Sequence, residues 1–402
     1  MPAPDSASAD RSPSPTAADE PGRGDLLRAW KAEWPSAGAP RVFFAPGRVN
    51  LMGAHLDYNG GPVMPTAIDR GTYLAVRPRT DGVVRLASLV EHGRAELDVA
   101  RLPKRPLGVW HDYPVGVLRA LAEQLPSGTG FDLLYGGNLP IGAGLSSSAS
   151  ICVVTALALS ETLELGLTPE DWVDVALQAE RGFVGVQCGI MDPFAVGCSR
   201  PGHLLWLDCL DRSYEHVPLD AGRVAVATAD SGVRRELAGG TFNQRVSECE
   251  QLCQTLAPGS RFLRELDPEA FWSRESELPA ALAARGRHVF SELARAFSAR
   301  EALRAGDVES FGRLMTESHA SLRRDFEVSI EELDALVDLA AEVPGFLGSR
   351  LTGAGFGGCT VILLERGAEE ELRSALEVGY LERFGRKPMV RTFAGDPGPR
   401  EL

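Results

Sequence analysis

Residues 45–61, which read APGRVNLMGAHLDYNGG, are the most informative stretch of this 402-residue chain. They follow an apolar, strand-like run at 41–44 and place an arginine, a histidine and a carboxylate between glycines. Glycines let a backbone turn sharply and approach a ligand closely. Polar side chains on a loop that is anchored by a strand bind ligands more often than they pack. We therefore expect Arg48, His55 and Asp57 to belong to a binding site, with a polar surface loop as the alternative.

A second segment, residues 138–150, reads NLPIGAGLSSSAS and runs directly into an apolar stretch at 151–159. This pattern predicts a Gly/Ser-rich loop that opens a helix. The free N–H groups and the positive end of the helix dipole attract phosphate, and consecutive N–H groups in such a loop can form an anion-binding nest. An ordinary serine cap would explain one serine but not the two glycines before it. No Gly-Lys-Ser/Thr follows, so the segment is not a Walker A loop.

A third segment, residues 348–364, reads GSRLTGAGFGGCTVILL. Its glycines at 353, 355 and 358 satisfy the pattern G-x-G-x-x-G. The dinucleotide-binding interpretation is rejected, because that fingerprint opens a helix, whereas here a β-branched apolar run predicts a buried strand. Two interpretations stay open: a loop that shapes the floor of a ligand site, and a tight turn into the strand.

These three segments, together with CGIMDPF at 188–194, resemble in order and spacing the motifs of the GHMP kinase superfamily, and specifically those of galactokinases. The first is similar to the galactokinase signature, whose usual form is GRVNLIGEHTDYNGG. The second and third resemble the phosphate-binding loop and the C-terminal glycine motif, and the fourth is similar to CGIMDQF. Weaker matches occur at 110–113 and 317–329, so the resemblance covers roughly residues 40–390.

The resemblance implies an α+β fold with two domains, an N-terminal domain of the ribosomal-protein-S5-like type and a C-terminal ferredoxin-like domain, with the active site in the cleft between them. We place the N-terminal domain with its ATP-binding loop at 24–212 and the C-terminal domain at 213–402. Residues 1–23 are rich in Pro, Ser, Ala and Asp, so we expect a disordered tail. Hydrophobic patterning predicts strands at 42–45, 72–77, 83–88, 130–135, 203–208, 223–229 and 359–364, and helices at 111–124, 147–165, 168–183, 241–256, 287–304, 307–323, 330–342 and 368–383.

The resemblance also implies a reaction: an ATP-dependent sugar kinase that transfers the γ-phosphate to the anomeric C1 hydroxyl of galactose or a galactose-configured sugar, with Mg²⁺ as cofactor. Phosphoryl transfer needs a phosphate cradle, charge compensation and an oriented nucleophile. We expect Asp192 to act on the sugar hydroxyl as base or electrostatic orienter, and Arg48 to stabilise negative charge. A cation beside the aspartate would favour its ionised form and make it a weak base, so orientation can matter more than proton abstraction. A purely structural Asp–Arg pair is the alternative.

The expected ATP-binding residues form the Gly/Ser-rich loop and one aromatic near the adenine: Gly142, Ala143, Gly144, Leu145, Ser146, Ser147, Ser148, Ala149 and Trp110. For Trp110, core packing is an equal alternative. We expect Ser148 and Glu180 to supply oxygen ligands to Mg²⁺, which prefers a few such ligands besides the substrate phosphates. For Glu180, a carboxylate on the surface of a helix is the alternative.

His55, Asp57 and the backbone of Gly189 are expected to recognise sugar hydroxyls. Two positions of the signature depart from the galactokinase pattern: Ala54 replaces the glutamate and Leu56 replaces the threonine. In addition, Phe242 stands where the family has a tyrosine. In galactokinases that glutamate faces the C6 end of the sugar. Its loss would deprive a 6-hydroxyl of a partner, but it would also spare a 6-carboxylate a repulsion. Galacturonate, the substrate of a related branch, is therefore an open alternative to galactose.

An alternative from another functional class is a regulator that senses a sugar without catalysing a reaction. It is disfavoured because the loop at 146–149 is intact and both Arg48 and Asp192 are present.

Composition limits the possible partners and location. The net charge of −14 argues against nucleic acid and anionic membranes as partners. No apolar stretch reaches the roughly 18 residues of a membrane span, and the N-terminus lacks the pattern of a secretory signal. The seven cysteines show no metal-site spacing and are expected to be reduced thiols. We expect a cytoplasmic monomer or small homo-oligomer whose partners are a sugar and ATP.

Overall fold

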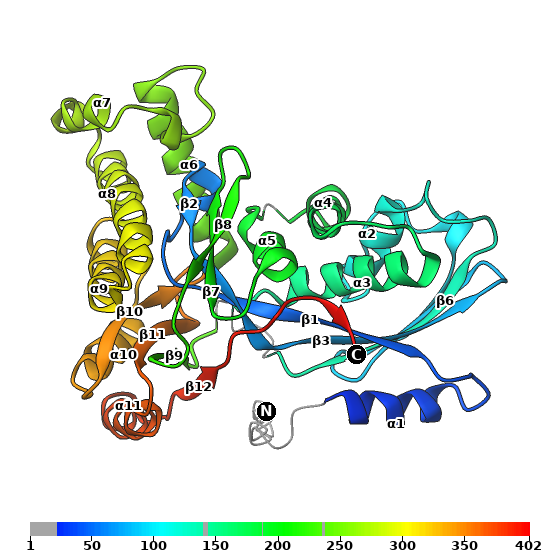
Figure 1. The fold of residues 1–402 in the computed structure, drawn as a ribbon. Coiled ribbons are helices and arrows are strands. Elements are labelled where there is room, and N and C mark those ends of the chain that lie inside the picture. The colour runs from blue at the N-terminus through cyan, green and yellow to red at the C-terminus, as the bar shows by residue number, and fades with distance from the viewer. Residues whose placement is uncertain (1–21, 140–143, 187, 235–237) are drawn as a thin grey trace, which may run out of the picture.

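The computed structural model describes residues 22–139, 144–186, 188–234 and 238–402 (Figure 1). The tail expected at 1–23 lies outside these ranges except for its last two residues. The first helix, α1 (Arg23–Glu33), already begins within that expected tail.

The N-terminal half is built on a six-stranded sheet in the order β13-β1-β3-β6-β4-β5. Neighbouring strands are antiparallel except for β4 and β6. The strands are β1 (Arg41–Asn50), β3 (Pro65–Arg79), β4 (Val83–Ser88), β5 (Ala95–Asp98), β6 (Gly130–Gly137) and β13 (Arg400–Glu401). Because β13 is the last strand of the chain and pairs with β1, residues 400–401 return to the N-terminal sheet.

Helices cover both faces of this sheet (Figure 1). One face carries α2 (Asp112–Ala120), α3 (Ser147–Leu163), α4 (Pro169–Leu177) and α5 (Met191–Cys198). The other face carries α1. The alternation of side chains along the strands explains this division: on β6, Leu133 packs into the core under α3, whereas the next residue, Leu134, packs against Trp30 of α1.

The C-terminal half contains a four-stranded antiparallel sheet in the order β10-β11-β9-β12. Its strands are β9 (Val224–Asp230), β10 (Phe346–Thr352), β11 (Cys359–Glu365) and β12 (Met389–Phe393). One face packs on α10 (Glu331–Ala341) and α11 (Glu369–Phe384), and the other faces the group of α6 (Ala238–Leu256), α8 (Ala280–Arg304) and α9 (Val308–Arg324), with the short α7 (Pro268–Trp272) beyond them. A small sheet of β2 (Pro62–Val63), β7 (His203–Asp208) and β8 (Tyr214–Pro218) lies between the halves.

The largest hydrophobic core joins the two halves. It contains Val49 of β1, Leu205 of β7, Val289 of α8 and Val361 of β11, all of which are fully buried. Because this core is continuous, the two halves bury a common apolar surface, and the end of β1 is held against the C-terminal elements. The expected α+β architecture is confirmed.

Most predicted elements are present, with several corrections. The helix predicted at 168–183 ends as an α-helix at Leu177 and continues as a π-helical turn, Gln178–Val184. The helix predicted at 111–124 ends at Ala120, and that predicted at 287–304 begins earlier, at Ala280. The sequence did not predict α5, α7, β2, β5, β8, β10, β12 or β13. Most of these are short, and β10 carries a glycine, a serine and an arginine that hide its strand pattern.

No helix in the described ranges combines the length and the apolar character needed to cross a bilayer.

Candidate active site

The Gly/Ser-rich loop opens α3 at Ser147, as predicted, but not through an ordinary serine cap. Ser146 takes the N-cap position with a left-handed φ of +64°, and its side chain makes no capping bond. Its hydroxyl oxygen is buried and finds no hydrogen-bond partner within the described residues. The first N–H groups of α3 and this hydroxyl are therefore available to an anion. Of the expected loop residues, Gly142 and Ala143 lie outside the described residues.

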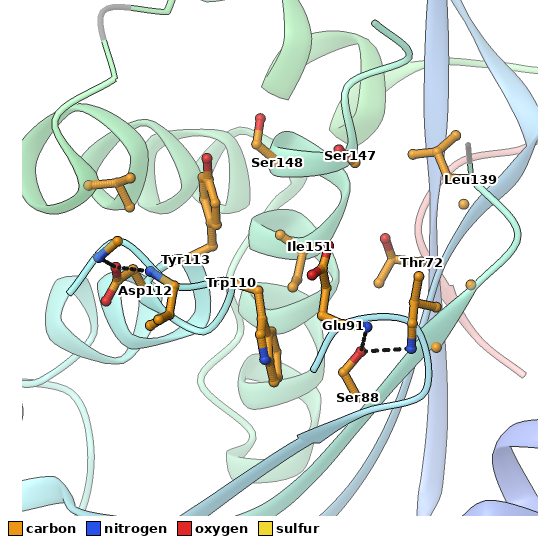
Figure 2. Close-up of a pocket in the computed structure, with 17 residues that line it drawn as sticks. Thr72, Ser88, Glu91, Trp110, Asp112, Tyr113, Leu139, Ser147, Ser148 and Ile151 are labelled. Atoms are coloured by element: carbon orange, nitrogen blue, oxygen red, sulfur yellow. Dashed lines mark hydrogen bonds between the residues drawn. The ribbon is translucent and has the colours of Figure 1, made fainter. Parts of the chain in front are cut away.

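Two cavities meet at this helix start. The first, of about 470 Å³, lies beside α2 and α3 and is shown in Figure 2. The second, of about 400 Å³, extends toward the C-terminal half. Ser147 and Ser148 line both. Gly144, Leu145 and Ser146 line the second cavity, whereas Ala149 lines neither, because its side chain is buried in the N-terminal core.

Aromatic and apolar side chains line the first cavity, with Trp110, Tyr113 and Ile151 around its interior (Figure 2). Trp110 also packs on the hydrophobic core, as its structural interpretation predicted, whereas its contact with a nucleotide base stays a prediction. One wall is organised by Asp112, whose carboxylate accepts hydrogen bonds from the N–H groups of residues 107, 108 and 109 at 2.7–3.1 Å. A largely apolar slot that ends at a helix N-terminus suits a flat base joined to phosphates.

All the residues predicted to act on or bind the sugar line the second cavity: Arg48, Ala54, His55, Asp57, Gly189, Asp192 and Phe242. They come from β1, the loop after it, the segment before α5, α5 itself and α6. Residues as far apart as 48 and 242 therefore converge on one space.

Arg48 and Asp192 form a close ion pair at the wall of this cavity. Two guanidinium nitrogens of Arg48, Nε and Nη2, lie 2.8 and 2.6 Å from Asp192 Oδ1. The third, Nη1, donates to the carbonyl oxygen of Gly144 at 2.6 Å, so Arg48 also ties the Gly/Ser-rich loop to β1. The Arg48 side chain is 6% exposed, whereas that of Asp192 is 26% exposed and remains accessible to a bound molecule.

Asp57 is a second carboxylate of the cavity. Its burial, followed by the negative charge of Asp192, raises the pKa of Asp57 to about 6. Gly189 allows this arrangement, because a Cβ at that position would lie 1.8 Å from Asp57 Oδ2. Only glycine lets the two segments approach this closely.

Gly189→Ala is expected to displace the Asp57 carboxylate and to lower the kcat/KM of this site about 100-fold, because a misplacement of about 1 Å in the bound geometry costs that much in rate. Steady-state kinetics would measure this. Gly182→Ala is the control, because Gly182 lies seven residues earlier, on the turn Gln178–Val184, and a Cβ there meets no atom within 4 Å. Equal kcat/KM values for the two variants would contradict the prediction.

His55 sits in a strained conformation at the edge of the same cavity. Its φ of +59° is left-handed, which costs a non-glycine residue about 1–2 kcal/mol. The ring is held by Tyr58, whose hydroxyl lies 3.0 Å from Nδ1, and by packing on Phe326. Backbone strain that the surroundings enforce often accompanies function. Ala54, beside it, and Phe242, whose ring centroid is 6.0 Å away, add apolar surface.

Glu180 lies on the π-helical turn, a feature frequent at functional sites. It is 1% exposed, which excludes the alternative of a surface carboxylate. Burial raises its pKa to about 7, partly offset by a hydrogen bond from Ser148. Glu180 lines neither cavity, but it is hydrogen-bonded to Ser148, which lines both, and these two hard oxygens fit Mg²⁺. The described residues contain no cluster of three or more His, Cys, Asp or Glu side chains that would suit a metal, so substrate phosphates and water would complete the shell.

The sequence missed several residues that line the second cavity: Asn50, Tyr58, Cys188, Met191, Arg350 and Ala354. Arg350 is buried, and its guanidinium donates to the carbonyls of Asn50 and Leu51 at 2.7 and 2.8 Å. Gly353 and Ala354 lie in the turn between β10 and β11 and also line the cavity. The third segment is therefore a turn into β11 that also lines the cavity, and its role in a ligand site stays a prediction. Arg350, within this segment, was the signal that the sequence analysis did not use.

Comparison with known proteins agrees with this geometry. Residues 31–78 match the galactokinase galactose-binding signature, 112–200 the GHMP kinases N terminal domain, and 299–380 the GHMP kinases C terminal domain. The chain is 45% identical to the galactokinase of Roseiflexus sp. over 88% of its length and 91% of that protein. It is 39% identical to the galactokinase of Enterococcus faecalis, covering 90% and 95% of the two chains.

Among solved structures, Lactococcus lactis galactokinase complexed with galactose is 32% identical, with a TM-score of 0.88 over 94% of this chain and 99% of that one. The mevalonate kinase of Methanococcus jannaschii shares the fold alone, with 19% identity and a TM-score of 0.64 over 89% and 99% of the two chains. The sequence identity, the coverage and the three matching regions agree: the chain belongs to the galactokinase family of the GHMP kinases.

Proposed function

We propose that this protein phosphorylates the anomeric C1 hydroxyl of galactose with ATP, in the second cavity, to give the sugar 1-phosphate. The observation that carries the proposal is the meeting of two cavities at the N-terminus of α3, with the Arg48–Asp192 pair in one and an aromatic slot in the other. A donor and an acceptor bound in these cavities would bring their reacting groups to Ser147 and Ser148.

The first cavity would take the nucleotide. Its apolar lining suits the base, while the N–H groups at the start of α3 and the unpartnered hydroxyl of Ser146 would bind the phosphates. Ser148 and Glu180 would hold Mg²⁺, which supplies charge neutralisation on the phosphate oxygens when it is bound. Mg²⁺ binding would require Glu180 to lose its proton. Because the pKa of Glu180 is raised to about 7, binding of the cation would drive that loss near neutral pH.

The second cavity would orient the sugar. Asp192 accepts the hydrogen of the attacking C1 hydroxyl, and Arg48 holds Asp192 in place and faces the transferring phosphoryl group with positive charge. Asp57, His55 and the backbone of Gly189 bind other hydroxyls, which fixes the nucleophile for in-line attack. Because Asp192 is already ion-paired, we propose that orientation contributes more than proton abstraction.

The choice of sugar rests on the lining near Ala54. Two arginines line the cavity within the described residues, and both are engaged: Arg48 with Asp192, and Arg350 with main-chain carbonyls. Neither arginine is therefore free to neutralise a carboxylate on the sugar, and this favours galactose over galacturonate. The relatives, which are named galactokinases, favour the same choice.

A second candidate is galacturonate. The observation in its favour is that Ala54 and Phe242 both line the cavity, so the signature glutamate and the family tyrosine are missing from the site itself. A carboxylate at C6 would meet no fixed negative charge at position 54.

The test is ADP release from purified protein with Mg·ATP, with galactose and galacturonate offered in parallel. We expect kcat/KM to be higher for galactose. Activity on galacturonate alone would reverse the assignment of the sugar. Activity on neither sugar would overturn the proposal and favour the regulator.

The pH dependence of sugar use should follow Asp57. This carboxylate has a pKa near 6, above the ordinary 3.8, so protonation as the pH falls through 6 removes its negative charge and turns one of its two acceptor oxygens into a donor. We expect kcat/KM for galactose, at saturating Mg·ATP, to fall about tenfold per pH unit below 6 and to be level above 7.

The raised pKa of Asp57 makes the stability of the fold change with pH in the opposite direction to sugar use. A carboxyl whose pKa is raised by folding stabilises the fold below pH 3.8 and loses that contribution as the pH rises through 6. Asp57→Asn should therefore raise Tm at pH 8 more than at pH 5, while it impairs sugar binding. A kcat/KM that stays level down to pH 5 would contradict this account.

A further inference from the structure

The buried carboxylate of Glu292, on α8, accepts hydrogen bonds from the backbone of the loop that carries His55 and Asp57. Glu292 is 0% exposed and lines neither cavity. Its Oε1 accepts the N–H groups of Gly53 and Ala54 at 3.1 and 3.0 Å, and the hydroxyl of Ser318 at 2.8 Å. Its Oε2 accepts from Arg295 Nε at 2.8 Å. Four donors, one of them cationic, thus fix this carboxylate in one place.

The same helix also holds the carbonyl of Ala54. His288 lies one turn before Glu292, and its Nε2 is 3.2 Å from Ala54 O. A carbonyl oxygen only accepts, so Nε2 carries the hydrogen. Nδ1 lies 3.0 Å from the hydroxyl oxygen of Ser321, whose single hydrogen is shared between Nδ1 and Asp325 Oδ2, 3.2 Å away. Burial lowers the pKa of His288 to about 4, so the ring is neutral at physiological pH. Both polar groups of the Ala54 backbone are therefore bonded to one face of α8.

The loop needs such support. Gly53 and His55, on either side of Ala54, both have left-handed φ values, +85° and +59°. His55 and Ala54 line the sugar cavity directly. Ala54 has no polar side chain, so only its backbone can fix the geometry of the loop at this position. The hydrogen bonds from Glu292 and His288 of α8 to that backbone fix it.

We propose that Glu292 is a positioning residue for sugar binding: it holds Gly53 and Ala54 so that His55 and Asp57 face the sugar. This inference rests on the proposed function, because it takes the second cavity to be the sugar site. It adds that the site depends on α8 of the C-terminal half, although every sugar-side residue of the signature lies in the N-terminal half.

The test compares Glu292→Gln with Asp132→Asn. Asp132 is an equally buried carboxylate, paired with Arg77 and Arg79 in the N-terminal sheet, and it lines neither cavity. Both variants are expected to lower Tm. Glu292→Gln alone is expected to raise the KM for galactose about tenfold, because the loop loses a charge-assisted anchor, while the KM for Mg·ATP stays within twofold of wild type.

A KM for galactose that is unchanged in Glu292→Gln, or a KM for Mg·ATP that rises equally, would overturn the inference. If Glu292→Gln does not fold, His288→Leu takes its place: it should raise the KM for galactose, and His288→Gln, whose amide can still donate to Ala54 O, should largely restore it. An unchanged KM in His288→Leu would then overturn the inference. Absence of sugar-dependent turnover in the wild type would instead overturn the proposed function and this inference with it.

Discussion

Asp192→Asn is expected to lower kcat by about 10²–10⁴-fold, the range for removing a group that accepts a proton or orients a nucleophile. Asp192 is the accessible partner of the Arg48 ion pair and lies in the cavity that would hold the sugar. An asparagine can still accept from Arg48, so the fold and the sugar affinity should be largely retained. Single-turnover ADP formation measures the chemical step directly.

The pH dependence of the chemical step distinguishes the two roles of Asp192. A wild-type single-turnover rate that falls as Asp192 becomes protonated, with a pH-independent rate in Asp192→Asn, indicates proton abstraction, whereas similar pH profiles in the two proteins indicate an orienting role. Binding of galactose, followed as a rise in Tm, is the control for an intact site. A kcat within tenfold of wild type, with galactose bound normally, would exclude Asp192 from the chemistry.

Arg48→Lys is expected to lower kcat by about 10²–10³-fold, as the loss of one fixed electrostatic donor does in other enzymes. The guanidinium contacts Asp192 through two nitrogens and the Gly144 carbonyl through the third. A lysine keeps the charge but cannot make this fork, so Asp192 and the Gly/Ser-rich loop would no longer be held together. We expect the KM for ATP to rise as well, because the loop is one of the two groups released.

Arg77→Lys is the matched control for Arg48→Lys. Arg77 pairs with the buried Asp132 in the N-terminal sheet and lines neither cavity. It should lose some stability and keep kcat. If Arg48→Lys behaves in the same way as Arg77→Lys, the Arg48–Asp192 pair is structural, which is the alternative that the sequence left open.

The sequence could predict those parts of the site whose polar residues lie within one short, continuous motif. Arg48, Asp57 and Ser148, which the sequence singled out, all line the second cavity. The sequence could single them out because the signature at the end of β1 and the Gly/Ser-rich loop each contain the turn residues that present their own polar groups. The start of α3 at Ser147 was predictable for the same reason. The hydrophobic runs of β6 and β11 likewise predicted buried strands.

The rest depended on contacts between residues distant in the sequence. Glu292 is 238 residues from Ala54, and nothing in the α8 sequence distinguishes it from the other charged residues of that helix. Arg350 bonds to Asn50 across 300 residues. Glu180 was expected on a regular helix, but it is buried on a π-helical turn, for which sequence periodicity gives no signal.

The position of the phosphate on the product tests the central claim most directly. Purified protein with galactose and Mg·ATP would be followed by ³¹P and proton NMR until ADP formation stops. The account predicts one new phosphate ester per ADP, coupled to the anomeric proton, and none of it from Asp192→Asn on the same timescale. A phosphate on any other hydroxyl, or ADP formed without a sugar phosphate, would contradict the assignment of the second cavity as a C1 kinase site.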